Sequence, residues 1–175
     1  MRLILFRHAK AEKAEPGEND HQRRLNDRGR DDARTIGAYL ARHKLIPDLA
    51  LVSPARRTRE TWERAVRELP AEPQTTHDER LYNATTDAIL TTIKAIKSAV
   101  HTLIVVGHNP GLHDVARLLI ASGDVEERER LAEGLPTAGL AVIDFAGDDW
   151  RKLHARGGRL DRFVTPRSLA AADRV

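Results

Sequence analysis

Three short stretches of the chain place histidine or arginine directly after an apolar run. "LILFRHAK" ends in Arg7 and His8, "LALVSPARRTRE" carries Arg57 among three arginines, and "LIVVGHNPG" leads into His108. A neutral imidazole held in one tautomer is a good nucleophile, and guanidinium groups grip phosphate or carboxylate oxygens with a planar fork. Together these residue types indicate chemistry on an anionic group such as a phosphoryl group.

Each of these stretches lies where a strand is predicted to end. Four consecutive large apolar residues at 3–6 are typical of a strand buried on both faces, and further strands are predicted over 48–53 and 103–107. Because strand and helix patterns alternate, we expect an α/β three-layer sandwich, a largely parallel central sheet with helices on both faces. Ligands bind beyond the carboxyl ends of the strands in such folds, so the three stretches should meet at one edge.

Helix starts are predicted at two residues that precede a proline. Ser53 and Asn109 are the expected N-caps, and helices are also expected over 25–44, 85–99 and 125–134. The stretch "GLAVIDFAGDDWRKLHARG" predicts two strands that turn at 147–149. Residues from about 158 to 175 lack periodicity, and we expect a packed C-terminal extension or a loose tail there. The whole chain, residues 1–175, is expected to form a single domain.

Composition narrows the classes of function. The chain of 175 residues has no cysteine, which excludes disulfides, a thiolate nucleophile and zinc–thiolate sites. No run is long enough for a membrane span and the first residues do not match a signal peptide, so we expect a cytoplasmic protein without a membrane partner. The net charge is +3, but Lys and Arg are interspersed with Asp and Glu and aromatic residues make up only 4%. A nucleic-acid partner is therefore not expected.

The arginines after Ser53 stand at an unusual place. Cations in the first turns of a helix are unfavourable by about 0.3–1 kcal/mol each, and a bound anion reverses that effect. We expect Arg57 to bind such an anion and Arg56 and Arg59 to face water. A metal site at His108 and His113 is not expected, because ligands on one helix face lie three or four residues apart. No cofactor is predicted.

In order along the chain, "LFRHAK", "SPARRTRET" and "VVGHNPG" resemble the histidine phosphatase superfamily, which has the phosphoglycerate-mutase-like fold. The similarity covers nearly the whole chain and extends to "LNDRG", "DERLYNA" and "LPTAGLAVIDF". Its nearest branch is that of the small SixA-type phosphohistidine phosphatases. One departure is Ala9, which stands where the family has glycine after Arg-His.

The resemblance implies a role for each matching residue. His8 is expected to be the nucleophile of a metal-independent phosphatase and to form a covalent phosphohistidine. Arg7, Arg57 and His108 are expected to bind the phosphoryl oxygens, with His108 cationic in the complex. Arg23, in "DHQRRLNDRG", matches a position that also reaches the phosphate.

The resemblance leaves alternatives for the residue that protonates the leaving group and for the substrate. Glu79, in "HDERLY", is at the place where mutase-like relatives carry an acidic residue, and it serves either as proton donor to the leaving group or merely as an exposed loop carboxylate. The expected substrate is phosphohistidine on a partner protein, a phosphorelay or phosphotransferase component, which implies a role in signal transduction. The alternatives are a phosphatase of small phosphate esters with the same mechanism and, from another class, a non-catalytic phosphoprotein-binding module.

Overall fold

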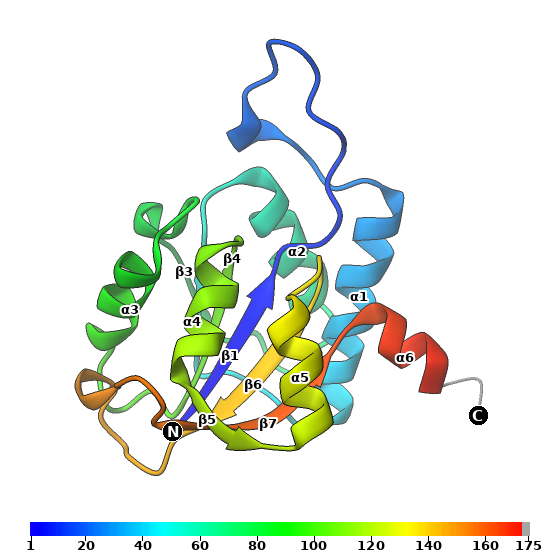
Figure 1. Cartoon of the computed structure of the whole chain (residues 1–175). Helices are drawn as coiled ribbons and strands as arrows, with labels where there is room; N and C mark the ends of the chain where they lie inside the picture. Colours follow the sequence, from blue (N-terminus) through cyan, green and yellow to red (C-terminus); the bar gives the residue numbers. More distant parts are fainter. Residues whose placement is uncertain (173–175) are drawn as a thin grey trace.

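A seven-stranded sheet of order β3-β2-β4-β1-β6-β7-β5 runs through the protein, in a computed structural model that describes residues 1–172 (Figure 1). Its strands are β1 (Arg2–Arg7), β2 (Leu49–Val52), β3 (Gln74–His77), β4 (Thr102–Gly107), β5 (Ile120–Gly123), β6 (Leu140–Asp144) and β7 (Gly158–Val164). Four neighbouring pairs are parallel, and the two pairs that involve β6 are antiparallel. The prediction of a largely parallel sheet is therefore confirmed.

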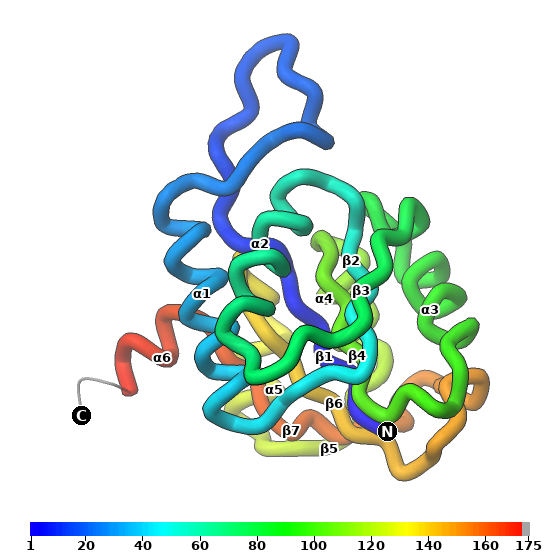
Figure 2. Tube along the Cα trace, turned by 180° about the vertical axis from the view of Figure 1, so that it is seen from behind, coloured from blue at the N-terminus to red at the C-terminus, as the bar shows by residue number. Residues whose placement is uncertain are grey.

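Helices cover both faces of this sheet, as predicted for a three-layer sandwich (Figures 1 and 2). One face packs against α1 (Asp27–Arg42), α2 (Arg56–Val66) and α6 (Pro166–Ala172), and the other against α3 (Thr86–Lys94), α4 (Gly111–Leu119) and α5 (Val125–Glu133). The described residues also form three short 3-10 helices, η1 (Asp20–Gln22), η2 (Glu79–Leu81) and η3 (Trp150–Lys152). No helix within residues 1–172 has the length and apolar character needed to cross a membrane.

The first strand is buried on both faces, as its apolar run predicts. Leu3 and Leu5 pack into the core beneath α3 and α4, whereas Ile4 and Phe6 pack into the core beneath α1 and α2. All four side chains are fully buried. Because side chains alternate along a strand, packing on both faces fixes β1 and the residues that follow it.

The predicted N-cap at Ser53 is wrong. Helix α2 begins at Arg56, and its N-cap is Ala55, which makes no side-chain cap hydrogen bond. The Ser53 hydroxyl instead lies 2.7 Å from Nε2 of His108, so this side chain forms a hydrogen bond with the histidine and does not cap the helix. Ser53 still supports the turn through its carbonyl, which accepts a hydrogen bond from the Thr58 hydroxyl.

The predicted N-cap at Asn109 is wrong for a similar reason. Helix α4 begins at Gly111 with Pro110 in the N-cap position. The Asn109 amide donates to the carbonyl of Leu135 at 2.8 Å, which ties the end of β4 to the loop before β6. Gly111 is required there, because a Cβ would lie 2.1 Å from the carbonyl oxygen of Ala84.

The region after β6 also differs from the prediction. The expected second strand directly after the turn at 147–149 is absent from the described structure, and η3 lies there instead. The next strand, β7, pairs with β6 on the side away from β1 and lies within the predicted C-terminal extension. The last residues of that extension, 173–175, lie outside the described residues. The pairing shifts register between Val142 and Ile143. This irregularity breaks the strict alternation of β7 and hides it from a period-two pattern.

Candidate active site

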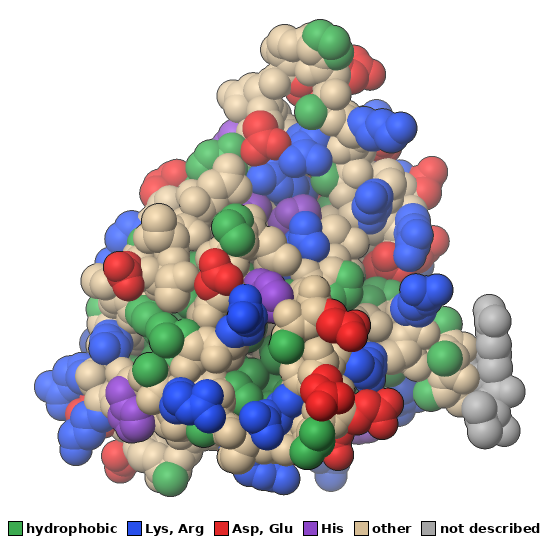
Figure 3. Space-filling model, viewed as in Figure 1, with side chains coloured by type: hydrophobic (Ala, Val, Ile, Leu, Met, Phe, Trp, Pro, Cys, Tyr) green, Lys and Arg blue, Asp and Glu red, His purple; other side chains and the backbone are tan. Residues whose placement is uncertain are grey.

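The three strand ends selected from the sequence lie at one edge of the sheet. Strands β2, β4 and β1 are neighbours, and Arg7 is in register with Gly107 while Val52 is in register with Val106. A cavity of about 430 Å³ opens beyond them, lined by Arg7, His8, Lys10, Ala11, Asp20, Arg23, Arg57, Asn83, His108, Asn109 and Thr137. The cavity thus brings together five of the six predicted site residues. Figure 3 shows purple histidine side chains among blue Lys and Arg side chains on this face, below the projecting segment that connects β1 to α1.

The ring of His8 is held in one tautomer. Its Nδ1 lies 2.8 Å from the carbonyl oxygen of Ala9, and a carbonyl only accepts, so Nδ1 carries the proton. The other nitrogen, Nε2, therefore keeps its lone pair. Burial, and then the charges of Arg57, Arg7 and Arg23, lower the pKa of His8 to about 4, against the opposing effect of the bond to Ala9. At neutral pH this imidazole is neutral, as nucleophilic attack requires.

His108 lies beside His8, with ring centroids 5.3 Å apart. Arg57 donates from Nη2 to His108 Nδ1 at 3.3 Å, so the proton of a neutral ring is on Nε2, which donates to the Ser53 hydroxyl at 2.7 Å. Burial is the main cause that lowers the pKa of His108 to about 3, with further lowering by His8 and Arg57. The free site therefore holds His108 neutral.

Arg57 is the most enclosed cation of the site. Its side chain is only 3% exposed, and it comes from the first turn of α2. Nη1 donates to the backbone carbonyl of Asp20 at 2.8 Å, and Nη2 donates to a carboxylate oxygen of the same residue at 3.1 Å. Its buried Nε has no hydrogen-bond partner among residues 1–172. The sequence argument for an anion at this helix start is consistent with this geometry.

Arg7 contributes a second guanidinium from the end of β1. Its Nη1 donates to the carbonyl of Leu135 at 3.0 Å, and its buried Nε has no partner in the described part of the chain. Burial lowers the pKa of Arg7, but a guanidinium stays charged in a protein. Arg7 thus retains hydrogen-bond donors for a ligand.

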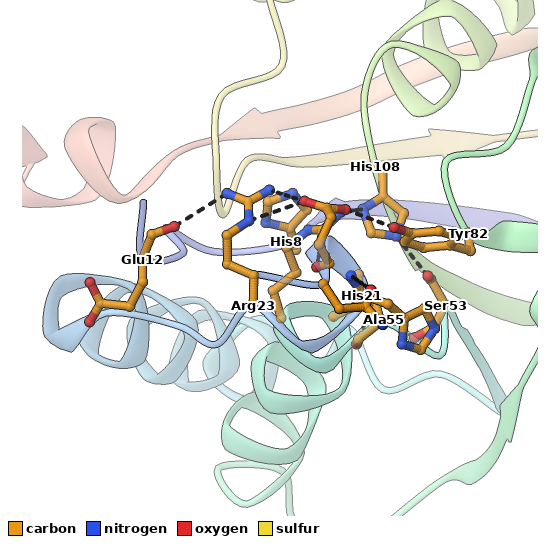
Figure 4. A network of polar contacts seen from close by, with 12 residues as sticks. His8, Glu12, His21, Arg23, Ser53, Ala55, Tyr82 and His108 are labelled. Atoms are coloured by element: carbon orange, nitrogen blue, oxygen red, sulfur yellow. Dashed lines mark hydrogen bonds and ion pairs between the residues drawn. The ribbon is translucent and has the colours of Figure 1, made fainter. Parts of the chain in front are cut away.

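Arg23 reaches the cavity from the segment that connects β1 to α1 and projects above the sheet in Figure 1. Its Nη2 and Nε donate to one carboxylate oxygen of Asp20 at 2.8 and 3.2 Å, and its Nη1 donates to the carbonyl of Glu12 at 3.3 Å. The other carboxylate oxygen of Asp20 accepts from the Tyr82 hydroxyl at 2.7 Å (Figure 4). Sequence reasoning missed Asp20 and Tyr82, because neither belongs to a strand end or a periodic pattern.

Glu79 is the predicted site residue that the structure does not bring to the cavity. It is exposed, it begins η2, and it is not among the residues that line the cavity. The carboxylate present in the lining is that of Asp20. The role of proton donor for Glu79 therefore stays a prediction without geometric support.

Ala9 fits the position where the family has glycine. It is fully buried, and its amide donates to the Thr61 hydroxyl at 3.0 Å. The same hydroxyl donates to the carbonyl of Arg57 at 2.6 Å. Thr61 thereby links the backbone next to His8 to the first turns of α2, so the nucleophile and the arginine are held in one frame.

Other parts of the described structure were compared with this cavity for metal ligands and for a nucleophile beside cations. Within residues 1–172, no three His, Cys, Asp or Glu side chains gather as ligands for a metal ion. A hollow of about 300 Å³ beside α4 and α5 is lined by apolar side chains and by Arg117, Arg128, Glu129 and Arg156, but it contains no histidine. The cavity at His8 is thus the place where nucleophile and cations occur together.

Comparison with known proteins agrees with this geometry. Residues 3–89 match the family model of the histidine phosphatase superfamily, branch 1. An uncharacterized protein of Mycobacterium leprae is 36% identical over 149 residues, which cover 85% of this chain and 89% of that protein. A candidate phosphohistidine phosphatase SixA of Agrobacterium tumefaciens shares 33% identity and superposes with a TM-score of 0.80, covering 94% of this chain and 97% of the other.

A further structure, the protein histidine phosphatase SixA complexed with tungstate, shares the fold at 20% identity, with a TM-score of 0.76 over 97% of this chain and 99% of that one. The fold, the paired histidines and the matched relatives together define a phosphatase. This chain belongs to the histidine phosphatase superfamily, and within it to the SixA type.

Proposed function

We propose that this phosphatase transfers a phosphoryl group from phosphohistidine of a partner protein to Nε2 of His8, without a metal ion, and then to water. In the first step the new bond joins Nε2 to phosphorus while the bond from phosphorus to the substrate nitrogen breaks. The departing imidazole keeps the electron pair and is protonated by solvent. In the second step water attacks phosphorus, releases inorganic phosphate and restores His8.

The observation that carries this proposal is the neutral, oriented imidazole of His8 beside two guanidinium groups. Phosphoryl transfer demands mainly in-line positioning and stabilisation of charge on the equatorial oxygens. Arg7 and Arg57 have donors available for those oxygens. The dianion of the substrate favours protonation of nearby groups, so in the complex we expect Nδ1 of His108 to gain a proton, to release its hydrogen bond from Nη2 of Arg57 and to donate to the phosphoryl group.

The proposed substrate class follows from the leaving group. A general acid contributes about 10²–10⁴-fold to rate where an alkoxide must leave. Glu79 is outside the lining of the cavity. Burial raises the pKa of Asp20, but the hydrogen bonds from Tyr82 and Arg23 and the charge of Arg57 together outweigh it and lower this pKa to about 2. A site that lacks a protonated carboxyl favours the imidazole leaving group of phosphohistidine over that of an alkyl ester.

The surroundings of the cavity support a macromolecular substrate with an acidic surface. Two further hollows adjoin the cavity, one along residues 10–26 and Arg56, the other beside α5 and α6. The linings of all three contain nine Lys or Arg side chains and five Asp or Glu side chains. These linings thus carry an excess of four positive charges, more than the net charge of +3 of the whole chain, so the positive charge is concentrated around the cavity. Such a field speeds encounter with an acidic partner.

The test compares substrates on one preparation. We expect kcat/KM for a phosphohistidine peptide to exceed that for a sugar phosphate and a phosphoserine peptide by at least ~10²-fold, the lower limit of a general-acid contribution. His8→Ala is the matched inactive control. A preference for sugar phosphates would favour the small-ester alternative, and binding of a phosphopeptide without any turnover would favour a non-catalytic module.

A further inference from the structure

Asp20 makes an unusual set of contacts for an anion at the edge of a phosphoryl site. Both of its carboxylate oxygens and its backbone carbonyl accept hydrogen bonds from three residues that surround the cavity: Arg23, Arg57 and Tyr82. Two of these donors are guanidinium groups that line the same cavity as His8. Asp20 is therefore the point where two cations of the site, Arg23 and Arg57, are joined.

The contacts to Arg57 fix more than its position. Asp20 binds Nη1 through its carbonyl at 2.8 Å and Nη2 through its carboxylate at 3.1 Å, so one residue holds both ends of the guanidinium fork. Two such bonds determine the plane of the group as well as its distance. The remaining Nε of Arg57, buried and without a partner within residues 1–172, is oriented as a consequence.

Tyr82 holds Asp20 from the opposite side. Its hydroxyl donates to the carboxylate at 2.7 Å across 62 positions of sequence, and its ring packs edge-on against His108 at 5.6 Å and against His21 at 4.8 Å. The projecting segment is thus fastened to the wall of the cavity by two consecutive residues, Asp20 and His21. Figure 4 shows Tyr82 and His108 side by side.

We propose, on the basis of the function proposed above, that Asp20 is a positioning residue that orients Arg57 and Arg23 toward the phosphoryl group, and that Tyr82 fixes Asp20 in turn. The carboxylate balances two converging cations that would otherwise repel each other. Both guanidinium groups are then in place before the substrate arrives, which lowers the cost of ordering them in the transition state. The competing interpretation is that Asp20 occupies the place of the phosphoryl group and inhibits its binding.

The experiment uses Asp20→Asn, Tyr82→Phe, the double variant and one control. Asp144→Asn is the matched control, because Asp144 also accepts two hydrogen bonds from an arginine, Arg2, and has a side chain 36% exposed against 43% for Asp20. Asp144 is the last residue of β6 and is in register with Arg2, at the opposite end of β1 from the cavity. Each variant is assayed for kcat and KM with an aryl phosphate and with a phosphohistidine peptide, and for binding of tungstate by calorimetry, after thermal unfolding has verified its fold.

For Asp20→Asn we expect a fall in kcat of at least ~10-fold, since a displacement of about 1 Å in a positioned group costs up to about 10²-fold. Tungstate binding is expected to weaken as well. Tyr82→Phe should lower kcat less, and the double variant should equal Asp20→Asn alone, because the hydroxyl of Tyr82 acts through the carboxylate. Asp144→Asn should leave all three quantities unchanged.

Three results would overturn the proposal. Tighter tungstate binding with an undiminished kcat in Asp20→Asn would identify the carboxylate as a competitor of the substrate. Equal behaviour of Asp20→Asn and Asp144→Asn, or additive effects of Asp20→Asn and Tyr82→Phe, would remove the positioning role. If the wild type turned over neither substrate, the proposed function would fail, whereas the tungstate measurements on Asp20→Asn and Tyr82→Phe would still decide the positioning role.

Discussion

Replacing Arg57 by alanine tests whether its enclosed charge stabilises the transition state. A unit charge about 4 Å from another is worth about 4 kcal/mol at an effective dielectric constant near 20. Part of this stabilisation is already present in the bound substrate, so kcat is expected to fall by about 10²–10³-fold, the range seen when one oxyanion donor is removed. The 3% exposure of Arg57 means that water cannot readily take its place.

The assay is steady-state hydrolysis of an aryl phosphate, with Arg57→Lys and Arg56→Ala as comparisons. Lysine keeps the charge but cannot hold the carbonyl and carboxylate of Asp20 together with His108, so Arg57→Lys should lie between wild type and Arg57→Ala. Arg56 is paired with Glu60 and has a side chain 44% exposed, so Arg56→Ala should retain nearly full turnover. Turnover of Arg57→Ala within about threefold of wild type, with unfolding unchanged, would refute the electrostatic reasoning.

Two further predictions concern stability. Folding lowers the pKa values of His8 and His108 to about 4 and about 3, so below pH 6.5 the unfolded chain binds more protons than the folded protein. The free energy of unfolding should therefore fall as the pH is lowered from 6.5 toward 4, by up to about 1.4 kcal/mol per pH unit for each imidazole. In urea unfolding across this pH range, the free energy of unfolding should depend less steeply on pH for His8→Asn than for the wild type. An equal dependence on pH would contradict the lowered pKa of His8. A Cβ at Gly37 would lie 2.4 Å from the carbonyl of Ala65, so Gly37→Ala should cost about 1–3 kcal/mol despite a helix-propensity gain of about 1 kcal/mol. Gly147→Ala, with nothing within 4 Å, should be neutral in the same urea titration, and equal effects of the two would refute the packing argument.

The part of the fold that could be predicted is the part with strong periodicity. The apolar run of β1 and the alternation of strands and helices were sufficient for the sheet and its two helical layers. Strand β7 could not be found, because the register shift near Val142 disturbs its alternation. Ser53 and Asn109 have residue types that suit N-caps, but contacts formed only in the folded protein use their side chains instead. Tertiary contacts override local preference at such places.

The site was predictable to the extent that strand ends determine it. His8, Arg57 and His108 each follow a strand or open the helix after one, so topology alone brings them together. Asp20 and Tyr82 meet across 62 positions from two segments without regular periodicity, and their pairing depends on how the projecting segment folds back. No local pattern encodes such a contact.

The most direct test of the account is to locate the phosphate in the trapped intermediate. The protein is mixed rapidly with a phosphohistidine peptide, quenched in alkali and analysed by mass spectrometry. We predict an acid-labile, alkali-stable phosphate on His8, formed within the first turnover and absent, with all turnover, from His8→Ala. Phosphate on another residue, or undiminished turnover by His8→Ala, would contradict the central claim that the imidazole of His8 accepts the phosphoryl group.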